Sequence, residues 1–157
     1  MAQNIVVCGD RHWTDRAVIA ARLRLFEPVE TQLITNNYGV LHGGGNGAPL
    51  PPRTSRRGQP RYRADLRAVG RRGADILVQE VAHALGLRVT VIPTDWQHER
   101  LHTGQHRHIE VMFRFDPVLV LVFHDHPAQS HSTTRFCCAI ANERGIPIEV
   151  VRSTPAD

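Results

Sequence analysis

The sequence predicts an α/β fold, a Rossmann-like three-layer sandwich with a mostly parallel five-stranded sheet. Short apolar runs of buried-strand type alternate with stretches of helical periodicity, which is the pattern of successive βαβ units. The first run, Asn4 to Cys8, breaks at Gly9 into a polar loop and then a helical pattern, as in the opening unit of such a sheet. The 157 residues are of single-domain size, so we expect one domain over 1–152 and a frayed tail over 153–157.

The first loop and helix supply the first candidate ligand residue. Thr14 or Asp15 can cap a helix whose apolar positions recur at helical spacing, namely Val18, Ile19, Leu23 and Phe26. Arg11 comes just before this helix, at the carboxyl end of the first strand, which is the edge where open α/β sheets bind ligands. Its guanidinium could bind a ligand there, or it could form a surface ion pair with Asp10 or Asp15.

A second strand is expected over 39–42, and it runs into Gly43, Gly44 and Gly45. Three consecutive glycines remove every Cβ from the turn, so backbone N–H groups can converge on a bound anion. A flexible turn is the alternative explanation of the same residues. We interpret the three glycines as the floor of a phosphate-binding site, because two other predicted strands also end in polar, turn-forming residues.

The segment 46–72 departs from the rest of the chain in composition. It contains four prolines and eight of the 19 basic residues, all of which are arginines, in a chain whose formal net charge is +4. A segment so rich in Pro, Gly and Arg cannot build a core, so we expect a long exposed insertion. It could be a solvated loop, a clamp over an anionic ligand, an oligomer contact or an arm that binds nucleic acid.

A clear helical pattern begins at Gly73-Ala74-Asp75 and ends at Gly86. Asp75 is either a favourable charge in the first turn or a ligand residue that binds a ribose hydroxyl or orients Arg11. The third strand, 87–92, is followed by Asp95 and Trp96, again at the carboxyl end of a strand. Trp96 could stack on a base or pack under the loop.

Histidines at positions 98, 102 and 106 are four residues apart, as in a metal-binding stripe on one helix face. Gly104 interrupts the helical pattern, and no carboxylate or cysteine clearly completes a ligand set, so we predict no metal site. A metal-dependent hydrolase that uses the histidine clusters is kept as an alternative function. No cofactor is expected.

The last third of the chain predicts two further helices and two strands. The helix from Arg107 to Phe113 stops at Asp116-Pro117, and the most apolar strand, 118–123, follows it. The last helix opens at Ser132-Thr133-Thr134, ends at Gly145 and leads into a strand over 147–151. Thr133 and Thr134 are helix caps or phosphate ligands.

Composition sets limits on location. The three cysteines are an odd number, with two of them adjacent in a helical pattern, so we expect reduced and mostly buried thiols. The most apolar run, 118–123, is too short to span a bilayer, and the first residues enter a strand pattern without the features of a secretory signal. We therefore expect a cytoplasmic protein with no membrane partner.

In their order along the chain, these motifs resemble the YspA-like, cpYpsA-related branch of the SLOG superfamily, a Rossmann-like group related to the LOG nucleotide-processing proteins. The motifs are Gly9 with Arg11, Gly43-Gly44, Gly73-Ala74-Asp75, Pro93 with Asp95-Trp96, Gly104 with Arg107, Asp116-Pro117, and Gly145-Ile146-Pro147. The resemblance covers nearly the whole chain except 46–72. It implies a nucleotide pocket at the carboxyl edge of the sheet, and it implies a homo-oligomer.

By position, the resemblance carries family roles onto the glycine turn, Asp75, the Asp95-Trp96 pair, Arg107 and the pair Thr133-Thr134. The departures are that His108 stands where asparagine is usual, Thr133 replaces a glycine, and the insertion splits the glycine turn from Gly73. The LOG enzymes also use a glutamate after the phosphate turn, where this chain has Arg135 and Phe136. These departures bear on catalysis more than on fold.

The sequence thus predicts binding of a nucleotide or nucleotide-derived ligand at the carboxyl edge of the sheet, by an enzyme, a ligand sensor or a sequestering protein. The expected ligand-binding residues are Gly9, Arg11, Gly43, Gly44, Gly45, Trp96, Arg107, Thr133 and Thr134. If the protein is an enzyme, we expect hydrolysis of a glycosidic or phosphate bond with Asp75 or Asp95 as the general base. The alternative from a different class is nucleic-acid binding through 46–72.

Overall fold

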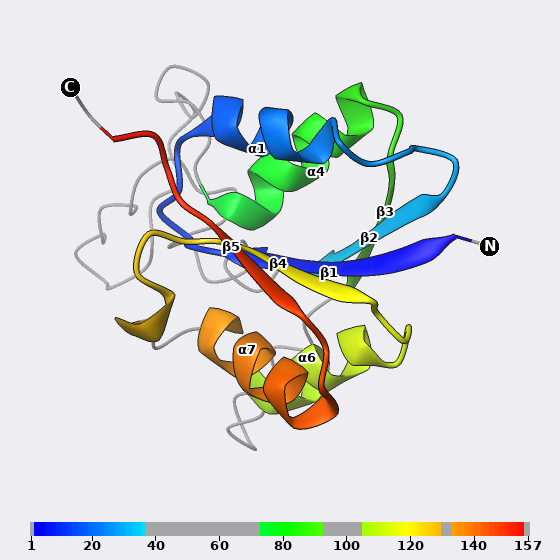
Figure 1. Cartoon of the computed structure of the whole chain (residues 1–157), viewed down its shortest axis with the longest axis vertical. Coiled ribbons are helices and arrows are strands. Elements are labelled where there is room, and N and C mark those ends of the chain that lie inside the picture. The colour runs from blue at the N-terminus through cyan, green and yellow to red at the C-terminus, as the bar shows by residue number, and fades with distance from the viewer. Residues whose placement is uncertain (1, 37–72, 93–104, 130–132, 156–157) are drawn as a thin grey trace, which may run out of the picture.

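The computed structural model describes residues 2–36, 73–92, 105–129 and 133–155, without the side chains of 105–108 and 133. Within these residues the sheet has five strands, all parallel, in the order β3-β2-β1-β4-β5 (Figure 1). The strands are β1 (Gln3–Gly9), β2 (Thr31–Asn36), β3 (Arg88–Ile92), β4 (Leu119–Phe123) and β5 (Ile148–Val151). The predicted α/β fold with a five-stranded parallel sheet is therefore confirmed.

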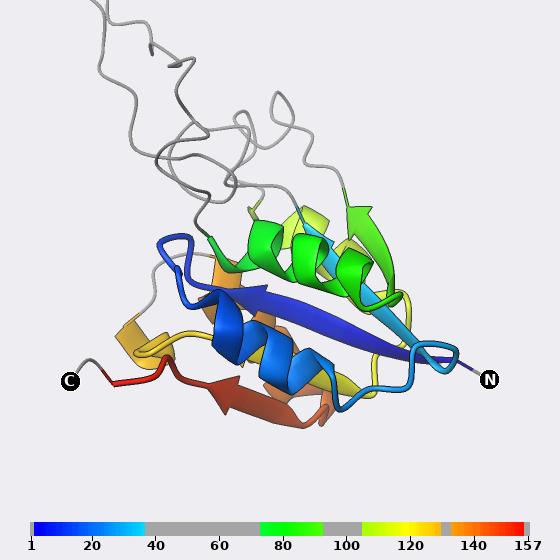
Figure 2. The ribbon, with the colours of Figure 1, turned by 90° about the horizontal axis from the view of Figure 1, so that it is seen from above.

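Two layers of helices cover the sheet. On one face lie α1 (Arg16–Leu23) and α4 (Ala74–Ala84), which pack side by side (Figure 2). On the other face lie α6 (Gln105–Phe113) and α7 (Thr133–Arg144), and a short 3₁₀ helix, η1 (Pro127–Gln129), follows β4. In the described part of the chain, no helix combines the length and apolar character needed to cross a membrane.

The second strand of the sheet lies earlier in the chain than expected. β2 is Thr31–Asn36, whereas the strand expected over 39–42 falls outside the described residues. The sequence of β2 contains only two strongly apolar residues, Leu33 and Ile34, so it lacks the apolar run that signals a buried strand. Nevertheless its last four residues are buried, because helices cover both faces of this strand.

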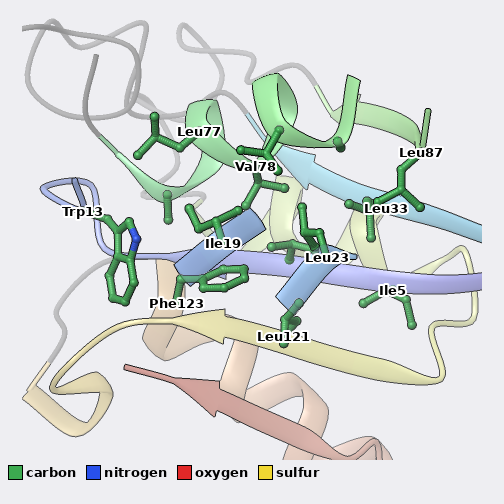
Figure 3. Close-up of a cluster of buried hydrophobic side chains, with 14 residues drawn as sticks. Ile5, Trp13, Ile19, Leu23, Leu33, Leu77, Val78, Leu87, Leu121 and Phe123 are labelled. Atoms are coloured by element: carbon green, nitrogen blue, oxygen red, sulfur yellow. The ribbon is translucent and has the colours of Figure 1, made fainter. Parts of the chain in front are cut away.

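The sheet separates two apolar cores, and alternate residues of each strand enter opposite ones. The core between the sheet and α1 and α4 is shown in Figure 3; its members include Ile5, Val7, Trp13, Ile19, Leu23, Leu33, Leu77, Val78, Leu121 and Phe123. The core on the α6 and α7 side includes Val6, Cys8, Ile34, Ile109, Met112, Phe113, Val120, Val122, Cys137 and Ile140. Burial on both faces explains why β1 and β4 are continuously apolar in sequence.

The helix boundaries follow local chemistry. α1 begins after Asp15, whose Oδ1 accepts a hydrogen bond of 3.2 Å from the backbone N–H of Val18. The helical segments before β3 and β5 end at Gly86 and Gly145, as the sequence predicts, and both glycines have positive φ, 76° and 69°. These ends return the chain to the amino edge of the sheet, so each following strand runs parallel to the others.

Candidate ligand site at the carboxyl edge of the sheet

The strand order creates one position where two neighbouring strands send the chain in opposite directions. After β1 the chain goes on to β2 and β3 on one side, whereas β4 and β5 occupy the other side. In open parallel sheets, ligands bind outside the carboxyl ends of the strands at such a switch point. The loops that follow β1 and β4 meet there, because the backbone N–H of Asp10 donates a hydrogen bond of 2.9 Å to the carbonyl oxygen of Phe123.

The loop after β1 is organised around Asp10. Its Oδ1 accepts a hydrogen bond of 2.9 Å from the backbone N–H of His12, and its carbonyl oxygen accepts from the backbone N–H groups of Trp13 and Ala74. The Trp13 ring is buried against Phe123, with ring centroids 5.9 Å apart, and its indole N–H donates to the carbonyl oxygen of Asp15. These contacts fix the loop and leave the side chains of Arg11 and His12 exposed.

Arg11 lies in this fixed loop with an exposed side chain. The ion pairs found among the described residues are Arg16–Glu80 and Arg22–Glu149, and neither involves Arg11. Of the two carboxylates suggested as its partners, Asp15 accepts from backbone N–H groups through both oxygens, and Asp10 accepts from the backbone N–H of His12 through Oδ1. Within the described residues, the Arg11 guanidinium is therefore available to an anionic ligand.

Gly9, another predicted ligand residue, has a packing role. A Cβ at this position would lie 2.5 Å from the Cβ of Ala74 and 2.5 Å from the carbonyl oxygen of Phe123. The missing side chain lets the first turn of α4 approach the ends of β1 and β4. This close approach explains the glycine without a ligand.

The loop after β4 contributes His124, which the sequence reasoning did not single out. Its backbone N–H donates to the carbonyl oxygen of Val151, and its ring Nδ1 accepts a hydrogen bond of 2.9 Å from the backbone N–H of His126. Partial burial lowers the pKa of His124, and the nearby carboxylates of Asp10 and Asp125 oppose this shift. The signal that could have found it is its position directly after the most apolar strand, at the same edge as Arg11.

Residues 152–154, which come after β5, are bound to the loops after β4 and β1. Asp125 accepts hydrogen bonds from the backbone N–H and hydroxyl of Ser153, at 2.7 and 2.6 Å, and its carbonyl oxygen accepts from the guanidinium of Arg152. The backbone N–H of Thr154 donates to Oδ2 of Asp15 at 2.9 Å. These hydrogen bonds lower the pKa of both Asp125 and Asp15. Ser153 and Thr154 belong to the tail for which the sequence predicts fraying.

Asp75, the predicted general base, lies in the first turn of α4 with its side chain turned into the protein. It is 1% exposed and close to the buried hydroxyl of Thr35 on β2. Burial raises the pKa of Asp75 to about 8, and the nearby Thr35 hydroxyl only partly opposes this rise. At neutral pH the carboxyl is therefore mostly protonated, and in this conformation it is shielded from a ligand.

Thr134, a predicted phosphate residue, is buried beside Cys8 on the other face of the sheet. A phosphate contact would therefore use its backbone N–H. Cys8 and Cys137 are free and buried, in agreement with the prediction for the cysteines, and Cys138 is free and half-buried. The adjacent Cys137 thiol and burial raise the pKa of Cys8, and burial raises the pKa of Cys138 to about 12. Both stay thiols at neutral pH and are poor nucleophiles.

The other predicted site residues lie outside the described residues. These are Gly43, Gly44 and Gly45 of the glycine turn, together with Asp95 and Trp96. The backbone of Arg107 lies in α6 and that of Thr133 begins α7, but neither side chain is described. The structure thus brings Arg11, which was predicted, and Asp10 and His124, which were not, to one edge of the sheet.

Across the described ranges, no group of three or more His, Cys, Asp or Glu side chains could hold a metal ion. The histidine at 106 belongs to α6 without a described side chain, and those at 98 and 102 fall outside the description. Comparison of the chain with models of known protein families, with curated proteins and with solved structures finds no match.

Proposed function

We propose that the protein binds a nucleotide or nucleotide-derived ligand at the carboxyl edge of the sheet, at the switch point between β1 and β4. The observation that supports this most is the placement of Arg11: it is exposed, in a fixed loop, at the edge where parallel sheets bind ligands, and without an ion pair in the described part of the chain. A guanidinium binds phosphate through paired, charge-assisted hydrogen bonds.

The N-termini of α1, α4 and α7 lie at the same edge, since each of these helices follows the carboxyl end of a strand. Helix N-termini favour negative charge, so a phosphate group at this edge is stabilised by more than Arg11 alone. In this proposal the glycine turn, Arg107 and the turn at Thr133 complete the phosphate site, and Trp96 stacks on the base. Membership of the SLOG superfamily is part of the proposal and rests on the series of sequence motifs.

Hydrolysis is not part of the proposal. The described candidate base, Asp75, is buried and mostly protonated at neutral pH, because its pKa is raised to about 8. A general base must reach the proton that it removes and must be ionised. Binding without turnover, as in a ligand sensor or a sequestering protein, therefore has the better support.

The test is isothermal titration with the 5′-monophosphates of adenosine, guanosine, cytidine and uridine, preceded by native mass spectrometry of the freshly purified protein. We expect one of the four to bind, and Arg11→Ala to weaken its binding by about tenfold or more, because a hydrogen bond to a charged group contributes about 1.5–3 kcal/mol. The matched control is Arg24→Ala, which removes an exposed arginine just after the C-terminal end of α1.

The proposal fails if none of the four nucleotides binds and the purified protein carries no nucleotide-like mass. The assignment of the ligand to the edge that carries Arg11 fails if Arg11→Ala and Arg24→Ala weaken binding equally. In that case the effect would come from the net charge of the chain and not from a phosphate contact at this edge.

A further inference from the structure

We infer that Asp10 and His124 form a subsite for the sugar hydroxyls of the ligand, with Asp10 as the acceptor and His124 as the donor. This inference rests on the proposed function, since it assigns the ribose of the same nucleotide. Neither residue belongs to the site that the sequence predicts, in which Asp75 would bind a ribose hydroxyl.

The sheet register places the two residues side by side. β1 and β4 are parallel neighbours whose last residues, Gly9 and Phe123, pair, so Asp10 and His124 are the first residues after the two strands. Their backbones are fixed: the Asp10 N–H donates to the carbonyl oxygen of Phe123 at 2.9 Å, and the His124 N–H donates to that of Val151 at 3.1 Å. The pair lies at the switch point itself, where the chain diverges on either side.

The hydrogen bond at Nδ1 decides what the His124 ring can do. Nδ1 accepts from the backbone N–H of His126, so in the neutral ring the proton resides on Nε2. The ring then presents one N–H donor and no free acceptor, and it cannot act as a general base through Nε2. A hydroxyl or phosphate oxygen of the ligand is the group that such a donor binds.

The charges of Asp10 and His124 favour a hydroxyl oxygen of the ligand over a phosphate oxygen. Burial holds the pKa of His124 below its ordinary value, against the carboxylates of Asp10 and Asp125 and together with the nearby His126 and Arg152. The ring is therefore neutral at physiological pH, and the carboxylate of Asp10 is left without a cation from His124. A phosphate beside Asp10 would be repelled, whereas a sugar hydroxyl can donate to the carboxylate.

The bonding capacity of Asp10 fits this assignment. Oδ1 accepts from the backbone N–H of His12, and within the described residues Oδ2 has no hydrogen-bond partner. A ribose diol can donate one hydroxyl hydrogen to Oδ2 and accept the Nε2–H of His124 at the same or the neighbouring hydroxyl oxygen. Arg11, the next residue after Asp10, can then bind the phosphate, so one short loop serves both parts of a nucleotide.

The test compares the tightest-binding of the four ribonucleoside 5′-monophosphates with its 2′,3′-dideoxy counterpart by titration. We expect wild-type protein to prefer the ribonucleotide by about tenfold or more, because the dideoxy sugar leaves both polar groups without a partner. Asp10→Ala and His124→Leu should each remove most of this preference. His124→Gln, whose amide N–H₂ can take the place of the Nε2–H, should retain part of it. The matched control is His83→Leu, at an exposed position in the last turn of α4.

A second measurement determines the protonation state and the tautomer of the His124 ring directly. Long-range ¹H–¹⁵N spectra of the free protein should show His124 neutral at pH 7.5 with its proton on Nε2. A proton on Nδ1, or a cationic ring, would overturn the inference whatever the protein binds. Equal affinity for ribose and dideoxyribose nucleotides would also overturn it while leaving the proposed function in place. The absence of any nucleotide binding would overturn both.

Discussion

Asp75 is a buried carboxyl group whose protonation is coupled to folding. Its pKa is raised from 3.8 to about 8 in the folded protein, because burial disfavours the charged form. Between these two values the folded chain holds a proton that the unfolded chain lacks. Raising the pH through this window therefore favours the unfolded state, and this carboxyl lowers the stability of the protein by up to about 1.4 kcal/mol per pH unit.

Asp75→Asn should therefore stabilise the protein at neutral pH. The neutral amide has nearly the shape of the protonated carboxyl, so the variant should be at least about 1 kcal/mol more stable than wild type at pH 7.5 and closer to it at pH 5. Urea unfolding at the two pH values measures this, with Glu143→Gln on the exposed face of α7 as the control. A variant that is less stable at pH 7.5, with an unchanged dependence on pH, would contradict the assignment of a protonated Asp75.

At the residue scale, the sequence is enough to place Arg11 at the carboxyl edge of the sheet. It does not distinguish a ligand-binding role from a surface ion pair with Asp10 or Asp15. The strand that ends at Gly9 predicts that Arg11 lies at the carboxyl edge, and the structure agrees. Whether Asp10 or Asp15 neutralises it depends on backbone N–H groups of His12, Val18 and Thr154. Thr154 comes from the far end of the chain, so no local sequence pattern can predict its hydrogen bond with Asp15.

At the scale of elements, Asp15 joins the start of α1 to the C-terminal segment. Its Oδ1 caps the helix through Val18, and its Oδ2 accepts from Thr154. Both hydrogen bonds favour the ionised carboxylate and lower the pKa of Asp15. A carboxylate whose pKa is lower in the folded than in the unfolded protein stabilises the folded state at pH values above its unfolded-state pKa. This contribution is lost as the pH falls through the folded-state pKa.

Asp15→Ala should destabilise the protein by about 1–2 kcal/mol at pH 7, which is the usual cost of losing an N-cap, and by less below about pH 4. Asp15→Asn keeps one oxygen acceptor for two donors, so its loss should be smaller. Thermal unfolding at both pH values measures these changes, and Glu27→Ala at an exposed position after α1 is the control. Equal losses at pH 7 and pH 3 would rule out a role for the ionised carboxylate.

The elements differ in how well sequence predicts them. Gly86 and Gly145 end helical segments where expected, because a glycine with positive φ is a local requirement. β2 was missed because its burial comes from the apolar cores on both faces of the sheet, which Leu33 and Ile34 enter from opposite sides, and not from a long apolar run of its own. Its Thr35 and Asn36 are buried polar residues, and composition alone assigns such residues to a loop.

At the scale of the whole molecule, the alternation of strands and helices is enough to predict the parallel sheet, since each crossover must return to the same edge. The same alternation predicts which edge holds the ligand. The placement of Asp10 beside His124 requires the register of β1 against β4, and five other described elements lie between these two strands along the chain. The fold is thus predictable from periodicity, whereas the site depends on contacts between distant segments.

The insertion 46–72 gives the last prediction, because it sets the sign of the net charge. It holds eight arginines and one aspartate, a net +7, so removing it changes the chain from +4 to −3. If this arm binds nucleic acid, the affinity of the whole protein for single-stranded RNA should fall steeply with salt, and it should be lost when a short Gly-Ser linker replaces 46–72.

The same deletion separates the proposed nucleotide binding from the alternative of nucleic-acid binding through 46–72. It retains Arg11, Asp10, His124 and the glycine turn, and the packing of α4 against α1 lies outside it. We therefore expect cooperative unfolding by circular dichroism and unchanged affinity for the mononucleotide. RNA binding that survives the deletion, or that does not respond to salt, would exclude the arm as a nucleic-acid site. Loss of mononucleotide binding in a folded deletion variant would instead show that the arm belongs to the site at the edge of the sheet.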